Sequence, residues 1–266
     1  MIHLFALLSL LLCGVCYTGF QNSSHFHNTG NRRSLLLLVF GGALLLRLLL
    51  AYTTHGFSND IACFAAWADR IFTLGPGQFY SAEMFTDYPP GFMYVLYLIG
   101  ALRSLLQIPY YSDLHILLLK LPAILCDIAC GFLLYREAVK RLHFSDLQGI
   151  FAASAYLFQP AVILNSSCWG QVDSVYTLMI ILMCLFLMKG NLLPAYAVYG
   201  LGVLLKPQML IFTPVLLAGI WDHVFLQDFS WRKFFYNLCG GLVVICGMLL
   251  LCAPFGLTAA ISQYTS

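Results

Sequence analysis

Charged side chains are scarce in this sequence. Only 9% of its 266 residues are Asp, Glu, Lys or Arg, whereas a soluble domain carries about 25%. The formal net charge is +2 and there is no basic stripe, so nothing favours nucleic-acid binding. The ten cysteines lie mostly in apolar runs and suggest neither a zinc site nor a disulfide framework. Internal repeats and compact metal-ligand clusters are also missing, so we expect no required metal or other cofactor.

Apolar side chains take the place of the missing charge. They make up 61% of the chain, more than one domain of this length can bury, which predicts an all-α integral membrane protein. A transmembrane helix needs roughly 20 mainly apolar residues. The candidate runs are Ile2–Phe20, Ser34–Thr53, Gly91–Leu106, Leu114–Tyr135, Gly149–Leu164, Ser174–Met188, Leu192–Leu205, Met209–Trp221 and Phe235–Ala253.

Basic residues between these runs predict the topology, because short cytosolic loops are rich in Lys and Arg. If every basic cluster is cytosolic, one of the three runs between Arg33 and Arg136 does not cross. We expect it to be Gly91–Leu106, which starts after Pro89 and carries Arg103, and which we interpret as a juxtamembrane helix. Seven spans remain, or eight if Ile2–Phe20 is a span and not a signal peptide.

This topology places the polar motifs on one external face. The long loop 54–113, the stretch Trp169–Asp173 and the turn Lys206–Gln208 all fall on that side. If Gly91–Leu106 crossed the membrane, the first two would lie on opposite sides. We therefore expect any site of chemistry to lie at the external membrane surface.

Two acidic residues of the external loop are candidates for catalysis. Asp60 follows an expected helix N-cap at Ser58 or Asn59, and apolar residues then recur at helical spacing, which predicts an amphipathic helix on the membrane. Asp60 either takes part in catalysis or merely complements the helix dipole. Asp87 precedes Tyr88 and two prolines, a pattern that a turn and a helix start would also explain.

Charges within the predicted spans are the second group of candidates, because such charges are costly and usually paired or functional. Arg47 lies about 9 Å and Lys120 about 10 Å from the outer end of its run, at 1.5 Å per residue. This shared depth favours a common anion, although both side chains could instead snorkel to the headgroups. Asp127 lies about two turns deeper on the face of Lys120. Lys206, before Pro207, is either a further cation for the anion or an interface anchor.

The stretch Trp169–Asp173 places polar groups at the start of an apolar run. Trp169 offers a flat face to a sugar, or anchors the chain at the interface. Gln171 and Asp173 can bind hydroxyl groups, or can be solvated at the membrane surface. The residue types alone do not decide between these alternatives.

Several motifs in this order resemble one family of membrane enzymes. They are FAAWA, FY at Phe79, DYPPG, LKLPAILCDI, NSSCWGQVDS and LLKPQ, preceded by an Asp after the first span. The chain resembles the bacterial relatives of the GPI second-mannose mannosyltransferase, within the GT-C superfamily, from about Leu35 to Gly256. The resemblance implies a GT-C-like bundle over residues 34–256, with a separate segment 1–33. The relatives continue with further spans beyond the tail 257–266, so we expect a partial chain.

The resemblance implies an inverting glycosyltransferase of a bacterial cell membrane, or of the endoplasmic reticulum in a eukaryote. The expected partners are a polyprenyl-phosphate sugar, with mannose as the first expectation, and a glycan or lipid-linked acceptor on the non-cytosolic face. Asp60 matches the catalytic acid of the superfamily. The alternatives are a transporter or lipid-handling protein, and an inactive GT-C-like protein.

The expected chemistry assigns a role to each candidate residue. Asp60 acts as the base, and Asp87 orients a sugar hydroxyl, positions the helix of Asp60 or shares a metal. The other expected contacts bind the phosphate or the sugar. These substrate-binding residues are Arg47, Lys120, Trp169, Gln171, Asp173, Lys206 and Gln208.

Overall fold

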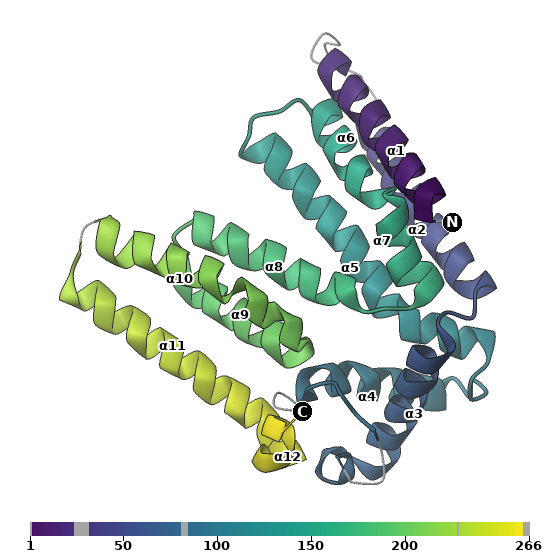
Figure 1. Ribbon diagram of the computed structural model, residues 1–266, viewed down its shortest axis with the longest axis vertical. Helices are drawn as coiled ribbons and strands as arrows, with labels where there is room; N and C mark the ends of the chain where they lie inside the picture. Colours follow the sequence, from purple (N-terminus) through teal and green to yellow (C-terminus); the bar gives the residue numbers. More distant parts are fainter. Residues whose placement is uncertain (1, 24–31, 81–84, 228, 263–266) are drawn as a thin grey trace. The chain divides into compact units, whose positions relative to one another are not determined.

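The computed structural model describes residues 2–23, 32–80, 85–227 and 229–262, and every regular element in these ranges is helical (Figure 1). The predicted all-α class is therefore confirmed. Of the predicted segments, the linker residues 24–31 and the tail residues 263–266 lie outside the described ranges. The helices are α1 (Ile2–Ser23), α2 (Arg32–Thr53), α3 (Ser58–Leu74), α4 (Pro90–Leu105), α5 (Asp113–Lys140), α6 (Asp146–Leu157), α7 (Pro160–Ile163), α8 (Asp173–Met188), α9 (Leu192–Leu205), α10 (Thr213–Trp221), α11 (Trp231–Cys252) and α12 (Leu257–Ser262). The short 3₁₀ and π turns are η1 (Pro76–Gln78), η2 (Leu164–Trp169), η3 (Pro207–Phe212), η4 (Asp222–Leu226) and η5 (Ala253–Phe255).

Long apolar helices make this a membrane-associated protein. Within the described ranges, four helical stretches are long and apolar enough to cross a bilayer: Arg32–Thr53, Asp113–Lys140, Pro207–Leu226 and Trp231–Phe255. A bent pair, Asp146–Leu157 with Pro160–Trp169, would make a fifth. Four other apolar stretches have only 10–17 residues. The count of seven to eight spans and the juxtamembrane position of Gly91–Leu106 therefore stay predictions.

The predicted span Gly149–Leu164 is broken into two helices in the structure. α6 ends at Leu157, α7 begins at Pro160, and the two segments differ in direction by 50°. Proline has no backbone N–H and disfavours helical geometry in the residue before it, and Gln159 is indeed extended. After α7 the chain continues as the wider π turn η2, which is capped by Gly170 with a φ of 89°.

The chain forms two compact units. The first unit combines Met1–Ile61 with Tyr111–Ser174, and the second combines Ala62–Tyr110 with Val175–Ser266. The boundary therefore falls within the first turn of α3.

The first unit is a cluster of packed helices. α5 packs on α6 and on α2, while α1 packs on α6 (Figure 1). Ala43, Ile150, Ala153 and Leu157 are buried in the core between α2, α5 and α6. A capping box at Ser145 starts α6, because its side chain accepts from the backbone of Gln148 while that glutamine side chain accepts in return.

The second unit places α9 at its centre. α9 packs against α4, α10 and α11 (Figure 1). A Cβ atom on Gly91 would lie 2.5 Å from the carbonyl oxygen of Leu204, so the start of α4 approaches α9 more closely than any other residue allows. Likewise, a Cβ on Gly100 would lie 2.4 Å from the carbonyl oxygen of Ala68 in α3.

The amphipathic helix predicted after Ser58 is confirmed as α3, within one residue at its start. Its apolar face is covered by protein: the ring of Phe64 packs edge-on against Tyr88 and Phe92, and Trp67 packs against Tyr88. The indole Nε1 of Trp67 also donates to the carbonyl oxygen of Phe85 at 3.0 Å. The apolar face of α3 therefore packs against protein, and the position of this helix on the membrane stays a prediction.

Candidate functional site

Two predicted site residues meet in the first unit. Asp60 lies in the first turn of α3, and Gln171 lies in the loop before α8. The side-chain Nε2 of Gln171 donates a hydrogen bond to Oδ2 of Asp60, although the two residues are 111 positions apart. Both side chains are half-buried. The second oxygen of Asp60, Oδ1, makes no hydrogen bond to any described residue, so it can still accept a proton from a ligand.

The backbone after α2 holds the two segments in contact. The N–H of Phe57 donates to the carbonyl oxygen of Trp169 at 2.8 Å, and their rings lie 5.7 Å apart. Gly56 has a φ of 80°, and a Cβ there would lie 2.7 Å from the same carbonyl oxygen. Gly170 has a φ of 89°, and a Cβ there would meet the side chain of Ile61 at 2.6 Å. Glycine is needed at both positions because of the left-handed backbone and the close approach.

The remaining groups of the loop differ in exposure. Trp169 keeps 45% of its surface exposed, so part of this side chain is accessible to a ligand. Asp173 is held in place, because Nδ2 of Asn165 donates to its Oδ2 at 2.9 Å. The backbone N–H groups of Gly170 and Gln171 both donate to the carbonyl oxygen of Asn165, at 3.1 and 3.0 Å. The loop is therefore a defined turn that holds the ring of Trp169 and the side-chain amide of Gln171 in place.

Lys120, which lies in the neighbouring helix α5, caps the C-terminal end of α2. Its side chain is completely buried, and Nζ donates to the carbonyl oxygens of Thr54 at 2.6 Å and Ala51 at 3.2 Å. A third bond goes to Oγ1 of Thr54 at 3.1 Å. An ammonium group has three hydrogens, so all its donors are used. A cation at this position also complements the negative end of the helix dipole of α2.

Replacing Lys120 with Met should therefore destabilise the first unit. The change leaves the carbonyl oxygens of Ala51 and Thr54 without their donor and removes the charge at the end of α2. We expect the free energy of unfolding to fall by about 3 kcal/mol, measured by thermal unfolding in detergent. Lys140→Met, at an exposed position of the same helix, serves as the control. Equal destabilisation by both changes would contradict the capping role.

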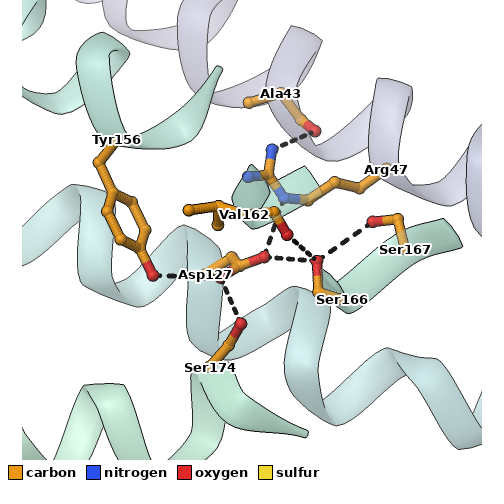
Figure 2. Close-up of polar contacts among 8 residues, drawn as sticks. All are labelled: Ala43, Arg47, Asp127, Tyr156, Val162, Ser166, Ser167 and Ser174. Carbon is orange, nitrogen blue, oxygen red and sulfur yellow. Dashed lines mark hydrogen bonds and ion pairs between the residues drawn. The ribbon is translucent and has the colours of Figure 1, made fainter. Parts of the chain in front are cut away.

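Asp127 accepts four hydrogen bonds inside the first unit (Figure 2). Its Oδ2 binds Nε of Arg47 at 3.2 Å and Oγ of Ser166 at 2.6 Å. Its Oδ1 binds Oγ of Ser174 at 2.5 Å and the hydroxyl of Tyr156 at 3.2 Å. The carboxylate is completely buried, and these donors satisfy it.

Arg47 is equally buried and forms an ion pair with Asp127. Its Nη1 also donates to the carbonyl oxygen of Ala43 at 3.3 Å, while Nη2 has no hydrogen-bond partner among the described residues. Its positive charge is thus balanced within the protein. The role predicted for Arg47, contact with a substrate phosphate, stays a prediction.

The common depth predicted for Arg47 and Lys120 is wrong. Lys120 contacts the end of α2 at Thr54, whereas Arg47 lies about two turns before that end. The two helices are offset, because α5 extends about two turns beyond α2 before it reaches Lys120. Asp127, a further two turns along α5, is therefore level with Arg47. The sequence alone does not reveal how far the two helices are offset. Arg47 could therefore not be predicted as the partner of Asp127.

The two serines that bind Asp127 lie on either side of the loop. Ser166 is in η2 before it, and Ser174 is in α8 after it. One carboxylate therefore fixes both ends of the segment that carries Trp169 and Gln171. Sequence reasoning missed this role, although the two serines flanking the WGQVD motif were a signal for it.

The candidates in the second unit form another group. The ammonium of Lys206 lies over the rings of Tyr88 and Tyr176, with Nζ 5.7 and 5.6 Å from their centroids. Asp87, next to Tyr88, is exposed, as is Gln208 in η3. The hydroxyl of Tyr80 donates to the carbonyl oxygen of Tyr88 at 2.9 Å and helps to hold this loop. The motifs DYPP and LLKPQ thus meet within one unit through a cation and an aromatic ring.

The structure therefore assembles the predicted residues in two groups. Asp60, Gln171, Trp169 and Asp173 belong to the first unit, while Asp87, Lys206 and Gln208 belong to the second. Their convergence on one external face stays a prediction. Among the described residues, no three His, Cys, Asp or Glu side chains gather as metal ligands do.

Comparison with known proteins adds no further assignment. The chain matches no protein-family model, and no curated protein is similar to it.

Proposed function

We propose that the protein is a membrane glycosyltransferase that moves a hexose, with mannose as the first candidate, from a polyprenyl-phosphate carrier to an acceptor hydroxyl on the non-cytosolic face. The observation that carries this proposal is the contact between Asp60 and Gln171. It joins the acid that matches the catalytic residue of the GT-C superfamily to the motif WGQVDS, which also carries the resemblance.

The proposed reaction is a single displacement that inverts the configuration at the anomeric carbon of the sugar. The acceptor oxygen attacks the anomeric carbon, a new C–O bond forms, and the bond to the phosphate oxygen breaks. The phosphate leaves with the electron pair, and the hydroxyl proton passes to Asp60. Oδ1 of Asp60 suits this role, because Gln171 holds the other oxygen and so orients the carboxylate.

The structure changes which cations we assign to the leaving phosphate. All three donors of Lys120 bind the end of α2, and Arg47 is paired with Asp127. We therefore assign them to holding the first unit together. Lys206 is our candidate for binding phosphate, and Trp169 for stacking on the sugar. The roles of Asp87, Lys206 and Gln208 rest on the resemblance.

The direct test is a transfer assay with purified protein. We expect radiolabelled mannose to pass from a polyprenyl-phosphate carrier to an added acceptor, and expect less transfer from the glucose carrier. A soluble nucleotide sugar serves as the control donor and should give no product. Absence of transfer from both lipid donors, with a range of lipid-linked and glycan acceptors, would contradict the proposal.

One observation favours a transporter as the second candidate. Transporters use interrupted helices and buried charges near the bilayer midplane, and the first unit contains a helix bent by 50° beside the buried pair of Arg47 and Asp127. Uptake of a labelled solute into proteoliposomes, without any covalent transfer of sugar, would support this candidate.

A further inference from the structure

A basic pocket lies at one end of the second unit. It has a volume of about 580 Å³ and is lined by the start of α9, by His223 of η4 and by the first residues of α11, including Arg232 and Lys233. None of the described lining residues is acidic. Arg232 makes no ion pair with any described residue. The pocket therefore carries positive charge that an anion can balance.

An apolar groove runs beside α11 in the same unit. It has a volume of about 390 Å³ and lies between α9, α10 and α11. Residues of α11 line it from Phe234 to Met248, a length of about 21 Å at 1.5 Å per residue. One leaflet of a bilayer core is about 15 Å deep. The groove is therefore long enough to hold one acyl chain across a leaflet.

The pocket and the groove adjoin at Asn237, which lines both. Its Nδ2 donates to the carbonyl oxygen of Lys233 at 2.8 Å, and its Oδ1 accepts from the hydroxyl of Tyr196 at 3.4 Å. Trp231 and Tyr236, at the same end of α11, are each 66% exposed. Exposed Trp and Tyr mark the level of lipid headgroups, so the change from basic to apolar lining occurs where a lipid changes from headgroup to tail.

We propose that the adjoining pocket and groove bind an anionic phospholipid, with its phosphate in the basic pocket and one acyl chain in the groove. Arg232 can bind phosphate oxygens through two parallel hydrogen bonds, and His223 and Lys233 add donors. The basic residues are those that the positive-inside pattern assigns to the cytosolic side. The site is independent of the proposed sugar transfer, which involves other residues. A helix packed in the groove would fit less well, because it would leave the positive charge of the basic pocket without an anion.

The headgroup contact is tested by counting bound lipid in native mass spectrometry of the full chain. We expect phosphatidylglycerol to bind more tightly than phosphatidylcholine with the same acyl chains. Arg232→Gln should weaken phosphatidylglycerol binding about fivefold, as expected for one charge at an anionic lipid surface. Lys140→Gln, at the exposed end of α5, should leave it unchanged. Equal binding of the two lipids, or no effect of Arg232→Gln, would overturn the proposal.

The acyl-chain contact has its own matched pair of variants. A Cβ at Gly241, which lines the groove, meets no atom within 4 Å, and the same is true of Gly247, which does not line it. Gly241→Leu should fill the groove and reduce lipid binding at least fivefold, whereas Gly247→Leu in the same helix should not. Unchanged binding in Gly241→Leu would exclude the groove. Displacement of the lipid by inorganic phosphate would show a simple ion site and would also overturn the proposal.

Discussion

Replacing Asp60 with Asn is expected to reduce sugar transfer at least about 100-fold, since a general base contributes roughly 10²–10⁴ to the rate. The fold should be kept, because the amide oxygen of Asn can accept the hydrogen bond from Gln171. The measurement is kcat/KM with a polyprenyl-phosphate sugar, together with thermal unfolding of the same preparation. The expected result is a large loss of rate at nearly unchanged stability.

The control for this variant is Asp113→Asn. Asp113 is also an acid in the first turn of a helix within the predicted external loop, and its side chain is about half exposed. The Asp113→Asn variant should transfer sugar at the same rate as the unsubstituted protein. If Asp60→Asn also transfers at that rate, Asp60 only complements the dipole of α3. Its loss would then cost about 0.3–1 kcal/mol of stability and no activity.

Replacing Asp127 with Ala is expected to lower the free energy of unfolding by about 3–5 kcal/mol, because it leaves the charge of Arg47 buried without a partner. It also removes the acceptor shared by Ser166 and Ser174, so the loop between them loses its common anchor. We therefore expect sugar transfer to fall in this variant even at temperatures where it remains folded. Thermal unfolding and the transfer assay measure the two effects.

A second Arg–Asp pair in the same unit provides the matched control. Nε of Arg32 lies 3.1 Å from Oδ1 of Asp146, but these side chains are 53% and 37% exposed. Exposed pairs contribute about 0–1 kcal/mol, so Asp146→Ala should have a small effect. The double change Arg47→Met and Asp127→Leu should recover much of the lost stability, because it removes both buried charges. A double variant as unstable as Asp127→Ala would show that the hydrogen bonds of the serines and Tyr156 dominate.

The helical class could be predicted because it depends on local properties of the chain. Long apolar runs without charges predict membrane helices whatever their neighbours are. The start of α3 follows from the capping residue types at Ser58 and Asn59 and its continuation from the apolar period. The end of α9 before Lys206 follows from Pro207 in the same way. The break at Pro160 carried a similar local signal, which the hydrophobicity of the surrounding run obscured.

Which side chains meet could be predicted only in part. The motif that contains Gln171 was expected to share a face with Asp60, and the two residues do touch. Asp87 and Lys206 belong to the other unit. No local sequence pattern predicts whether they lie near Asp60 and Gln171. The partners of Arg47 and Lys120 depend on how far α5 slides along α2. This offset arises from packing between residues about 70–80 positions apart, so neither helix encodes it alone.

The pair of Arg47 and Asp127 also bears on how the chain is assembled during synthesis. The two residues are separated by 80 positions, so α2 leaves the ribosome well before α5. A lone Arg within a membrane helix raises the free energy of insertion by up to about 2.5–3.5 kcal/mol, the value for a position at the helix centre. The leucine-rich remainder of α2 must offset this until Asp127 arrives. If α2 and α5 cross the membrane as predicted, this pairing joins two helices that enter the bilayer separately and gives α5 a specific partner when it inserts.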